Sequence, residues 1–355
     1  MPPKQVKGRK KPDSIGAGAV LSCASTGRCI EEKETTNMED RMFKLLRELV
    51  EFESVSGKEG SLTVFLAERL KSQGFMVSLQ EVTSGRHNLV ARKGDPRILY
   101  STHLDTVAPF IPFSVDGELL RGRGTCDAKG SMAAMLLAGE KLAAEGRDDV
   151  GYLFVVGEET TSDGAKKARE LGLEPEYIIL GEPTGNKVAA AQKGTLVFRL
   201  TVTGKAGHSA LPSSGSSALH KTAALIHEWI EEDWGVDSLR GETTLNFGRI
   251  TGGVSANVIA PLCQADGIFR LAEPFEKTMR IIRQKIGHDR EIEFDVLSHS
   301  EPLDFAEVPG FEKEVVAFGS DAPYLKDIAD IVMCGPGSII YAHSAEEQIR
   351  LTDLL

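Results

Sequence analysis

Two polar side chains that could bind a metal ion follow an apolar run at residues 98–100. This Ile-Leu-Tyr run is typical of a buried strand, and His103 and Asp105 come shortly after it. Residues two apart on an extended backbone lie on the same side. The Asp105 carboxylate can therefore accept a hydrogen bond from one imidazole nitrogen and leave the other free for a metal. A purely structural histidine would fit the same pattern, so the pair alone does not identify a site.

More potential ligands lie at the ends of other predicted elements: Asp127, Glu158, Glu159, Glu182 and His343. Ligands bind beyond the carboxyl ends of the strands in open α/β sheets, so we expect these side chains to lie near His103. Two histidines and three carboxylates can hold two divalent ions, with one carboxylate between them, and the fourth carboxylate can act as a base. A solvated acidic loop explains Glu158 and Glu159 alone, but not several strands that each end in a potential ligand.

The elements that must position these residues alternate between helix and strand. Apolar residues recur at three- and four-residue spacing from Met38 and again over 61–74, which predicts two helices. Further helices are expected at 125–146 and 164–171, and strands at 75–79, 88–91, 98–100, 151–156 and 177–180. This alternation predicts an α/β domain with a mostly parallel central sheet.

The pattern changes after residue 194. Strands are expected at 195–203, 243–250, 262–271 and 291–297, and helices at 217–229 and 275–286. This order predicts a small α+β (ferredoxin-like) domain inserted into the first. The chain then returns with a predicted helix at 311–318 and a strand at 328–334. We expect a catalytic domain of residues 38–194 and 299–355, an inserted lid or dimerisation domain of residues 195–298, and a disordered extension of residues 1–37.

Composition narrows the class of protein. The net charge of −11 disfavours nucleic acid as a partner, and no apolar run reaches the roughly 18 residues that span a membrane. The five cysteines are odd in number and scattered, which indicates reduced thiols. We therefore expect a cytoplasmic protein whose partner is a small molecule.

Several motifs together resemble the di-zinc amidohydrolases and exopeptidases that include acetylornithine deacetylase, succinyl-diaminopimelate desuccinylase and carboxypeptidase G. The matching pieces are Ser-Thr-His-Leu-Asp-Thr-Val at 101–107, Gly-Arg-Gly-Thr-Cys-Asp-Ala-Lys-Gly at 122–130, Gly-Glu-Glu at 157–159, Gly-Glu-Pro-Thr at 181–184, Gly-Lys-Ala-Gly-His-Ser at 204–209, Gly-Pro-Gly-Ser at 335–338 and Ala-His-Ser at 342–344. The resemblance runs from about Met38 to the C-terminus and implies a zinc-exopeptidase-like catalytic domain. Relatives usually continue through a final helix, and residues 346–355 resemble the beginning of that helix.

The resemblance implies two Zn²⁺ ions per subunit, with Co²⁺ as an alternative. Asp127 would bridge the ions; His103 and Glu182 would complete one site, and Glu159 and His343 the other. Asp105 would orient His103, and Glu158 would be the general base. The resemblance also implies a cis peptide bond after Asp127.

Three residues of the inserted domain are similar to family residues that reach the substrate. His208 would stabilise the oxyanion in the partner's site across a homodimer interface, and Asn257 would contact the substrate. Arg270 resembles an arginine that binds the substrate α-carboxylate, and a surface charge at a strand end is the alternative interpretation.

The substrate is indicated less sharply. Residues 320–325, 335–339, 342–344 and 247–250 look most like the acetylornithine deacetylase branch, which implies an N-acyl amino acid substrate and a role in arginine biosynthesis. Alternatives are an N-acetylcitrulline or N-acetyl-lysine deacetylase, a succinyl-diaminopimelate desuccinylase and a dipeptidase. Two alternatives lie outside this class of metal-dependent hydrolases. One is a binding protein that has lost its metal (a metal-dead relative), and the other is a hydrolase that uses Cys126 as its nucleophile, which would need an activating base.

Overall fold

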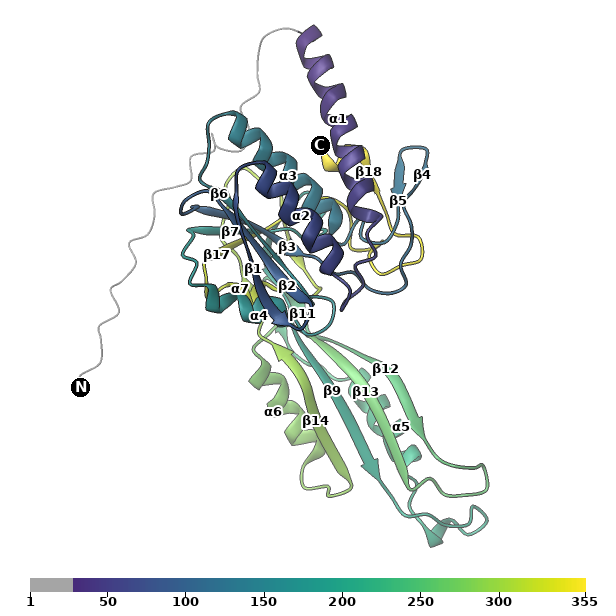
Figure 1. The fold of residues 1–355 in the computed structure, drawn as a ribbon. Coiled ribbons are helices and arrows are strands. Elements are labelled where there is room, and N and C mark those ends of the chain that lie inside the picture. Colours follow the sequence, from purple (N-terminus) through teal and green to yellow (C-terminus); the bar gives the residue numbers. More distant parts are fainter. Residues whose placement is uncertain (1–27) are drawn as a thin grey trace, which may run out of the picture.

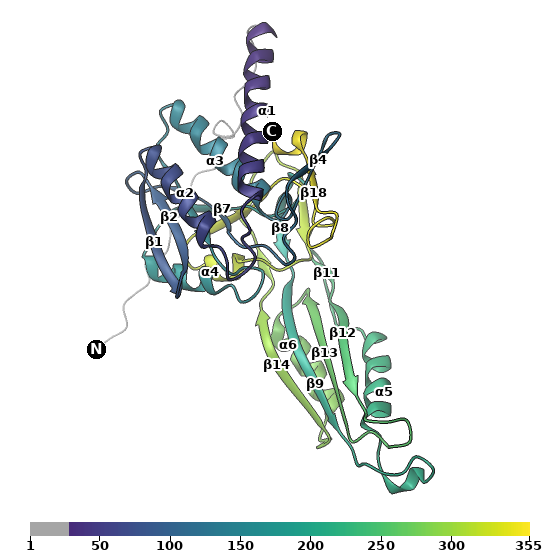
Figure 2. The same ribbon diagram turned by 45° about the vertical axis from the view of Figure 1, so that its right-hand side comes forward.

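The computed structural model describes residues 28–355, and their side chains from Met38 onward (Figure 1). Helix α1 (Arg28–Val50) begins inside the stretch expected to be disordered, and residues 1–27 of that stretch lie outside the described residues. The chain forms a broad upper unit and a narrow lower unit, which Figures 1 and 2 show as two separate bodies joined at one end. Among the described residues, no helix is long and apolar enough to cross a membrane.

The upper unit is built on a six-stranded sheet. Its order is β1 (Met76–Thr83), β2 (Arg86–Arg92), β6 (Val150–Val155), β3 (Ile98–His103), β7 (Tyr177–Leu180) and β17 (Asp330–Met333). The last four strands pair in parallel, and β1 and β2 add an antiparallel edge. The predicted α/β class with a mostly parallel central sheet is confirmed.

Helices cover this sheet on both faces because its central strands are apolar on both sides. In β6, Tyr152 and Phe154 pack with α1, α2 (Gly60–Ser72) and α3 (Lys129–Ala144). Leu153 and Val155 pack on the opposite side with α4 (Asp163–Ala168), which the 3₁₀ helix η2 (Arg169–Leu171) extends, and α7 (Ala322–Leu325). A strand buried on both faces reads as a continuous apolar run, as residues 150–156 do.

Two predicted helices are wrong. Residues 311–318 contain strand β16 (Lys313–Val316), which pairs in parallel with β8 (Val188–Gln192), while β15 (Leu303–Asp304) pairs on the other side of β8. Residues 346–355 form strand β18 (Gln348–Arg350) and the 3₁₀ helix η4 (Leu351–Leu354). Strand β18 pairs with the hairpin of β4 (Ser114–Asp116) and β5 (Leu119–Arg121). Partners distant in sequence decide these short segments, so local periodicity misreads them.

The lower unit is an antiparallel sheet with helices on one face (Figure 2). Its order is β12 (Thr244–Gly252), β13 (Leu262–Leu271), β9 (Gly194–Thr203) and β14 (Ile292–Ser300). Helices α5 (Ala218–Ile230) and α6 (Phe275–Ile286) pack on it around Phe198 and Trp229. A short hairpin of β10 (Val236–Asp237) and β11 (Gly241–Glu242) and the 3₁₀ helix η3 (Pro212–Ser214) complete it. The predicted inserted α+β domain is confirmed as a fold, while its division at residues 195 and 298 stays a prediction.

The contact between α3 and β6 matters because α3 follows Asp127 and β6 precedes Glu158. Gly139 of α3 lies against the buried ring of Tyr152, and a Cβ there would overlap the Tyr152 hydroxyl. In an open helix interior, glycine to alanine stabilises by about 1 kcal/mol. Here we expect Gly139→Ala to destabilise the protein by about 1–3 kcal/mol in urea unfolding.

Two variants make this prediction specific. Gly60→Ala is the matched control, because a Cβ there meets its nearest atom at 3.5 Å, and it should cause no loss. Tyr152→Phe removes the overlapping oxygen, so the double variant should regain part of the stability that Gly139→Ala loses. Equal stability of Gly139→Ala and Gly60→Ala would contradict the packing argument.

Candidate active site

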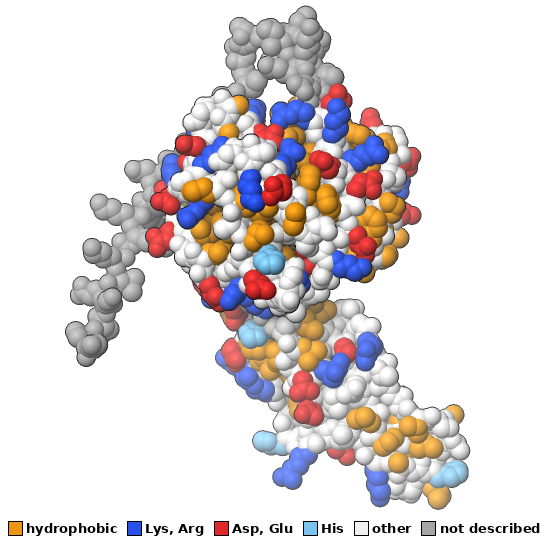
Figure 3. Space-filling view, in the orientation of Figure 1, with side chains coloured by type: hydrophobic (Ala, Val, Ile, Leu, Met, Phe, Trp, Pro, Cys, Tyr) orange, Lys and Arg blue, Asp and Glu red, His pale blue; other side chains and the backbone are white. Residues whose placement is uncertain are grey.

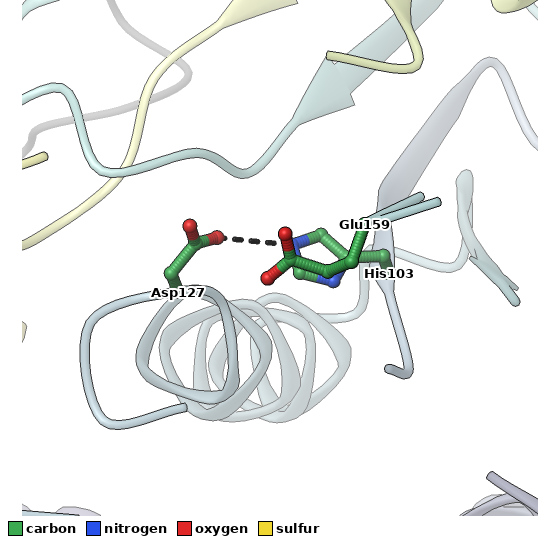
Figure 4. Close-up of side chains that lie close together, drawn as sticks. All are labelled: His103, Asp127 and Glu159. Carbon is green, nitrogen blue, oxygen red and sulfur yellow. Dashed lines mark hydrogen bonds and ion pairs between the residues drawn. The ribbon is translucent and has the colours of Figure 1, made fainter. Parts of the chain in front are cut away.

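The strand ends of the upper sheet bring the predicted site residues together. Strand β3 ends at His103, and β6 and β7 are followed within a few residues by Glu159 and Glu182. Asp127 lies just before α3, and His343 lies in the loop after β17. Figure 4 shows Asp127 at the start of its helix, facing His103 and Glu159, which come from the other side. The predicted convergence at one edge of the sheet is therefore what the fold produces.

Asp127 lies between two histidines. Its Oδ1 is 3.0 Å from His103 Nε2, and its Oδ2 is 3.4 Å from His343 Nε2. His343 Nε2 is also 2.8 Å from Glu159 Oε2. The two oxygens of one carboxylate thus face two different sets of ligand atoms, which is the arrangement that a carboxylate between two cations requires. The Asp127–Ala128 peptide bond is cis, which confirms that prediction.

The donor set fits divalent cations. His103, Asp127 and Glu159 each offer a ligand atom, and these atoms lie within 4.8 Å of one another. Oxygens Glu159 Oε1 and Glu182 Oε1 are buried and have no hydrogen-bond partner in the described part of the chain. Leaving buried polar atoms unpaired is costly. Imidazole and carboxylate ligands suit zinc and related ions, which would satisfy both oxygens.

Without such ions, the carboxylates of the site repel one another and lie where burial disfavours their charge. Burial raises the pKa of Glu158 and of Glu182 well above the usual value, and neighbouring carboxylates raise it further. Burial opposes the charge of Asp127 as well, but its hydrogen bonds to His103 and His343 lower its pKa. Hydrogen bonds to Asp127 and Glu159 raise the pKa of His343 to about 10. Cations placed among these groups would relieve the repulsion between the carboxylates.

Asp105 contacts His103 chiefly through its backbone, and its carboxylate has further partners. His103 Nδ1 lies 2.9 Å from the backbone carbonyl oxygen of Asp105, whereas the nearer carboxylate oxygen is 3.6 Å away, beyond hydrogen-bond distance. Donation to the carbonyl leaves His103 Nε2 facing Asp127. The Asp105 carboxylate instead accepts hydrogen bonds from the backbone N–H groups of Glu158 and Glu159 and from the Ser56 hydroxyl. It therefore holds the loop that carries these two glutamates.

The sequence reasoning missed Glu347, a buried carboxylate close to the site. Its Oε1 accepts hydrogen bonds from the backbone N–H groups of Gly124, Cys126 and Asp127 at 2.9, 3.1 and 3.0 Å. Its Oε2 accepts one from the buried guanidinium of Arg123 at 2.7 Å. The Glu346-Glu347 pair shortly after His343 was the available signal. Glu347 thus fixes the backbone of the segment that ends in Asp127.

The site opens into a cleft of about 610 Å³ between the two units. The metal-site acids lie on one side, and Arg270 of the lower sheet lies on the other. Arg270 has no ion-pair partner among the described residues, and burial lowers its pKa while the charge of Glu158 raises it. An unpaired guanidinium in a cleft is suited to binding a carboxylate.

His208 and Asn257 do not reach this cleft in the same chain. Both are exposed in loops joined by the His208–Val258 bridge, at the far end of the lower unit. His208 Nδ1 accepts a hydrogen bond from the Ala210 N–H at 3.1 Å, and Asn257 Oδ1 accepts one from Ser255 at 2.7 Å. Figure 3 shows hydrophobic side chains gathered near this end. Exposed apolar residues of this region include Leu211, Leu219, Val254 and Leu262.

Cys126 is not placed as a nucleophile. Its buried thiol donates to the Ser338 carbonyl oxygen at 3.2 Å, and burial raises its pKa far above the usual value. A reactive cysteine needs the opposite shift, toward the thiolate.

Known proteins resemble this chain over most of its length. A Peptidase M20 domain-containing protein of Schizosaccharomyces pombe is 38% identical over 328 residues, which cover 89% of this chain and 82% of the relative. A probable carboxypeptidase of Aspergillus niger is 35% identical and covers 87% of this chain and 85% of the relative. A family model described as a peptidase dimerisation domain matches residues 190–288.

Solved structures share the fold. A tripeptidase from Staphylococcus aureus superposes with a TM-score of 0.76 at 20% identity, covering 89% of this chain and 94% of that one. A Bacillus subtilis protein described as a dinuclear metal binding peptidase has a TM-score of 0.64 at 16% identity, covering 90% and 95%. At these identities the likeness establishes the fold, a catalytic domain with an inserted domain, and no more.

Glu347→Gln tests the backbone clamp. The neutral amide removes the counter-charge of the buried Arg123 guanidinium, and its single acceptor oxygen cannot serve both Arg123 and the three backbone N–H groups, which costs about 3–5 kcal/mol. Displacement of the Asp127 backbone should also weaken zinc binding by about 10–100-fold, as for other residues that orient ligands. Urea unfolding and zinc titration measure the two effects. Exposed Glu346→Gln is the matched control and should change neither; a Glu347→Gln variant that behaves like it would refute the clamp.

The pH dependence of metal binding tests His343. Its raised pKa of about 10 means that the imidazole is protonated at neutral pH without metal, whereas a ligand must be neutral. Zinc binding at pH 7 should therefore release about one proton from this residue and weaken as the pH falls from 8 to 6. Calorimetry in buffers of different ionisation enthalpy counts the protons. If His343→Ala releases as many protons as the unmodified protein, His343 is not a ligand.

Proposed function

The chain belongs to the M20 peptidase family, and we propose that it is a metal-dependent hydrolase of carboxypeptidase type. In this proposal it cleaves the amide bond between an acyl group, or a preceding residue, and an amino acid with a free carboxylate. One observation carries the proposal: the ligand cluster around Asp127 opens into the same cleft as the unpaired Arg270. The curated relatives described as probable carboxypeptidases support it.

The proposed metal centre uses the donor set described above. His103 and Glu182 would hold one divalent cation, Glu159 and His343 the other, and Asp127 both. Zinc is the ion we propose, with cobalt as the alternative, and the Bacillus subtilis relative is described as a dinuclear peptidase. Such ions supply Lewis-acid chemistry: they lower the pKa of water and polarise a carbonyl group.

Glu158 is the proposed general base. It lines the cleft beside the proposed ligands, and burial raises its pKa, which makes the carboxylate a stronger base. Glu158 takes a proton from the attacking water and delivers it to the leaving amine. Asp105 holds the Glu158 backbone in place through its carboxylate at 3.1 Å.

Arg270 and the far end of the inserted domain complete the proposal. Arg270 binds the α-carboxylate of the substrate, which sets the distance between that group and the scissile amide. His208 and Asn257 act from a second copy of the chain, in a homodimer formed through the inserted domain. The match of residues 190–288 to a peptidase dimerisation domain supports such a dimer.

N-acetylornithine is the substrate expected from the sequence, and a less polar substrate is the alternative hypothesis. The described residues that line the cleft include two cations, Lys166 and Arg270. The acidic residues among them are Asp127, Glu158, Glu159 and Glu182. All four acids have proposed roles, so the ornithine ammonium group would find no free carboxylate. We therefore propose carboxypeptidase-type hydrolysis ahead of arginine biosynthesis, with a cytoplasmic location.

Glu158→Gln tests the mechanism. The variant should keep both metal ions, because Glu158 is not a proposed ligand, while kcat falls by about 10²–10⁴-fold through loss of general-base catalysis. Metal analysis and assays on N-acetyl amino acids and dipeptides measure the two properties. Glu159→Gln is the matched neighbour and should instead weaken zinc binding.

Two results would overturn the proposal. Near-normal kcat in metal-loaded Glu158→Gln would remove Glu158 as the base. Purified protein that takes up fewer than about one zinc or cobalt ion per chain would favour a metal-dead binding protein. N-acetylornithine, N-acetylcitrulline, N-acetyl-lysine and N-succinyl-diaminopimelate belong in the same assay panel, because activity confined to one of them would replace the carboxypeptidase assignment.

A further inference from the structure

The face of the lower sheet that borders the cleft is arranged in two rows of side chains. The strand register places Thr195 opposite both Arg270 and Ser300, and Val197 opposite both Ile268 and Ser298. All six residues line the cleft. The first row is polar and contains the guanidinium that we propose as the carboxylate anchor. The second row contains two half-buried aliphatic side chains, Val197 and Ile268.

The distance between the rows suits the side chain of an amino acid. Positions two apart on one face of a strand are separated by about 7 Å. An amino acid whose carboxylate binds Arg270 in the first row can therefore extend its side chain over Val197 and Ile268 in the second. The carboxylate carbon and the outermost side-chain atom of a phenylalanine or methionine span a comparable length, and those of a leucine span a somewhat shorter one.

A β-bulge adds a third aliphatic residue to this surface. The pairing of β14 with β9 shifts register between Val296 and Ser298, which leaves Leu297 without an opposing residue. Leu297 is 53% exposed and lines the cleft. Bulges commonly redirect a side chain beside an active site. An exposed leucine next to two half-buried aliphatic residues forms an apolar surface that nothing in the described part of the chain covers.

The upper unit also contributes apolar side chains to the lining of the cleft. Phe318, Tyr324 and Ile339 of the upper unit contribute to the lining. The nearby cation Lys166 already donates to the Thr161 carbonyl oxygen and lies 4.6 Å from the centre of the Tyr324 ring. The surroundings therefore offer contact to hydrocarbon and no free acid among the described lining residues.

We propose that Val197, Ile268 and Leu297 form a subsite for an apolar side chain on the amino acid that the enzyme releases. The preferred substrates are then N-acyl derivatives or peptides that end in leucine, methionine or phenylalanine. The inference rests on the proposed function, because Arg270 must anchor the carboxylate for the side chain to reach the second row.

The test compares substrates that differ only in this side chain. Burying a leucine side chain in an apolar pocket should give N-acetyl-L-leucine a kcat/KM at least about tenfold above that of N-acetylglycine. Leu297→Asn should reduce this ratio by about fivefold or more, because the exposed leucine contacts the substrate side chain that N-acetylglycine lacks. Leu79→Asn, at an exposed leucine on β1 outside the cleft lining, is the matched control and should leave the ratio unchanged.

The outcomes separate this inference from the proposed function. Hydrolysis of N-acetyl amino acids with preference for aspartate, glutamate, lysine or ornithine would overturn the apolar subsite and leave the hydrolase proposal standing. A smaller change of the ratio in Leu297→Asn than fivefold would overturn the role of the bulge. Absence of hydrolysis of every N-acetyl amino acid and dipeptide by metal-loaded protein would overturn the proposed function itself.

Discussion

The mutual repulsion of buried carboxylates at one edge of the sheet is the constraint on which the site depends. Glu158, Glu159 and Glu182 lie around Asp127, and burial opposes the charge of each group whose pKa is shifted upward. Two histidines supply partial compensation to Asp127 from opposite sides. The fold thus concentrates acidic side chains where burial reduces their solvation, and this is an arrangement that would gain stability from bound divalent cations.

Two other buried acids position segments of the backbone. Asp105 accepts the N–H groups of Glu158 and Glu159, while Glu347 accepts those of Gly124, Cys126 and Asp127. Each acid thereby fixes a loop that is distant from it in sequence. Such loops have no regular secondary structure to hold them, so a carboxylate with several N–H donors takes the place of a strand partner. Neither acid belongs to the proposed ligand set, so the carboxylate of each is free to hold backbone.

The sequence predicted those features that depend on local pattern. Strands 177–180 and 262–271 and helix 275–286 match the structure, and His103 and Glu182 lie at the strand ends where ligands were expected. Features that depend on distant partners escaped it. Strand β16 is short and exists through its pairing with β8, and Glu347 is a buried acid that local polarity alone places at the surface. The roles of His208 and Asn257 stay predictions, because one chain does not bring them to the cleft.

The placement of Arg270 follows from how the two units are joined. The chain enters the lower unit at β9 and leaves it at β14, and these strands are neighbours, with Thr195 donating to the Ser300 hydroxyl at 3.2 Å. Arg270 lies opposite Thr195, in the row next to this connection, so a rotation of the units about it would move Arg270 little. Strand β9 continues for 10 residues, about 34 Å, toward the end that carries His208. No rotation about the near end brings the far end of a rigid sheet back to its own cleft. A catalytic role for His208 therefore requires a second copy of the chain.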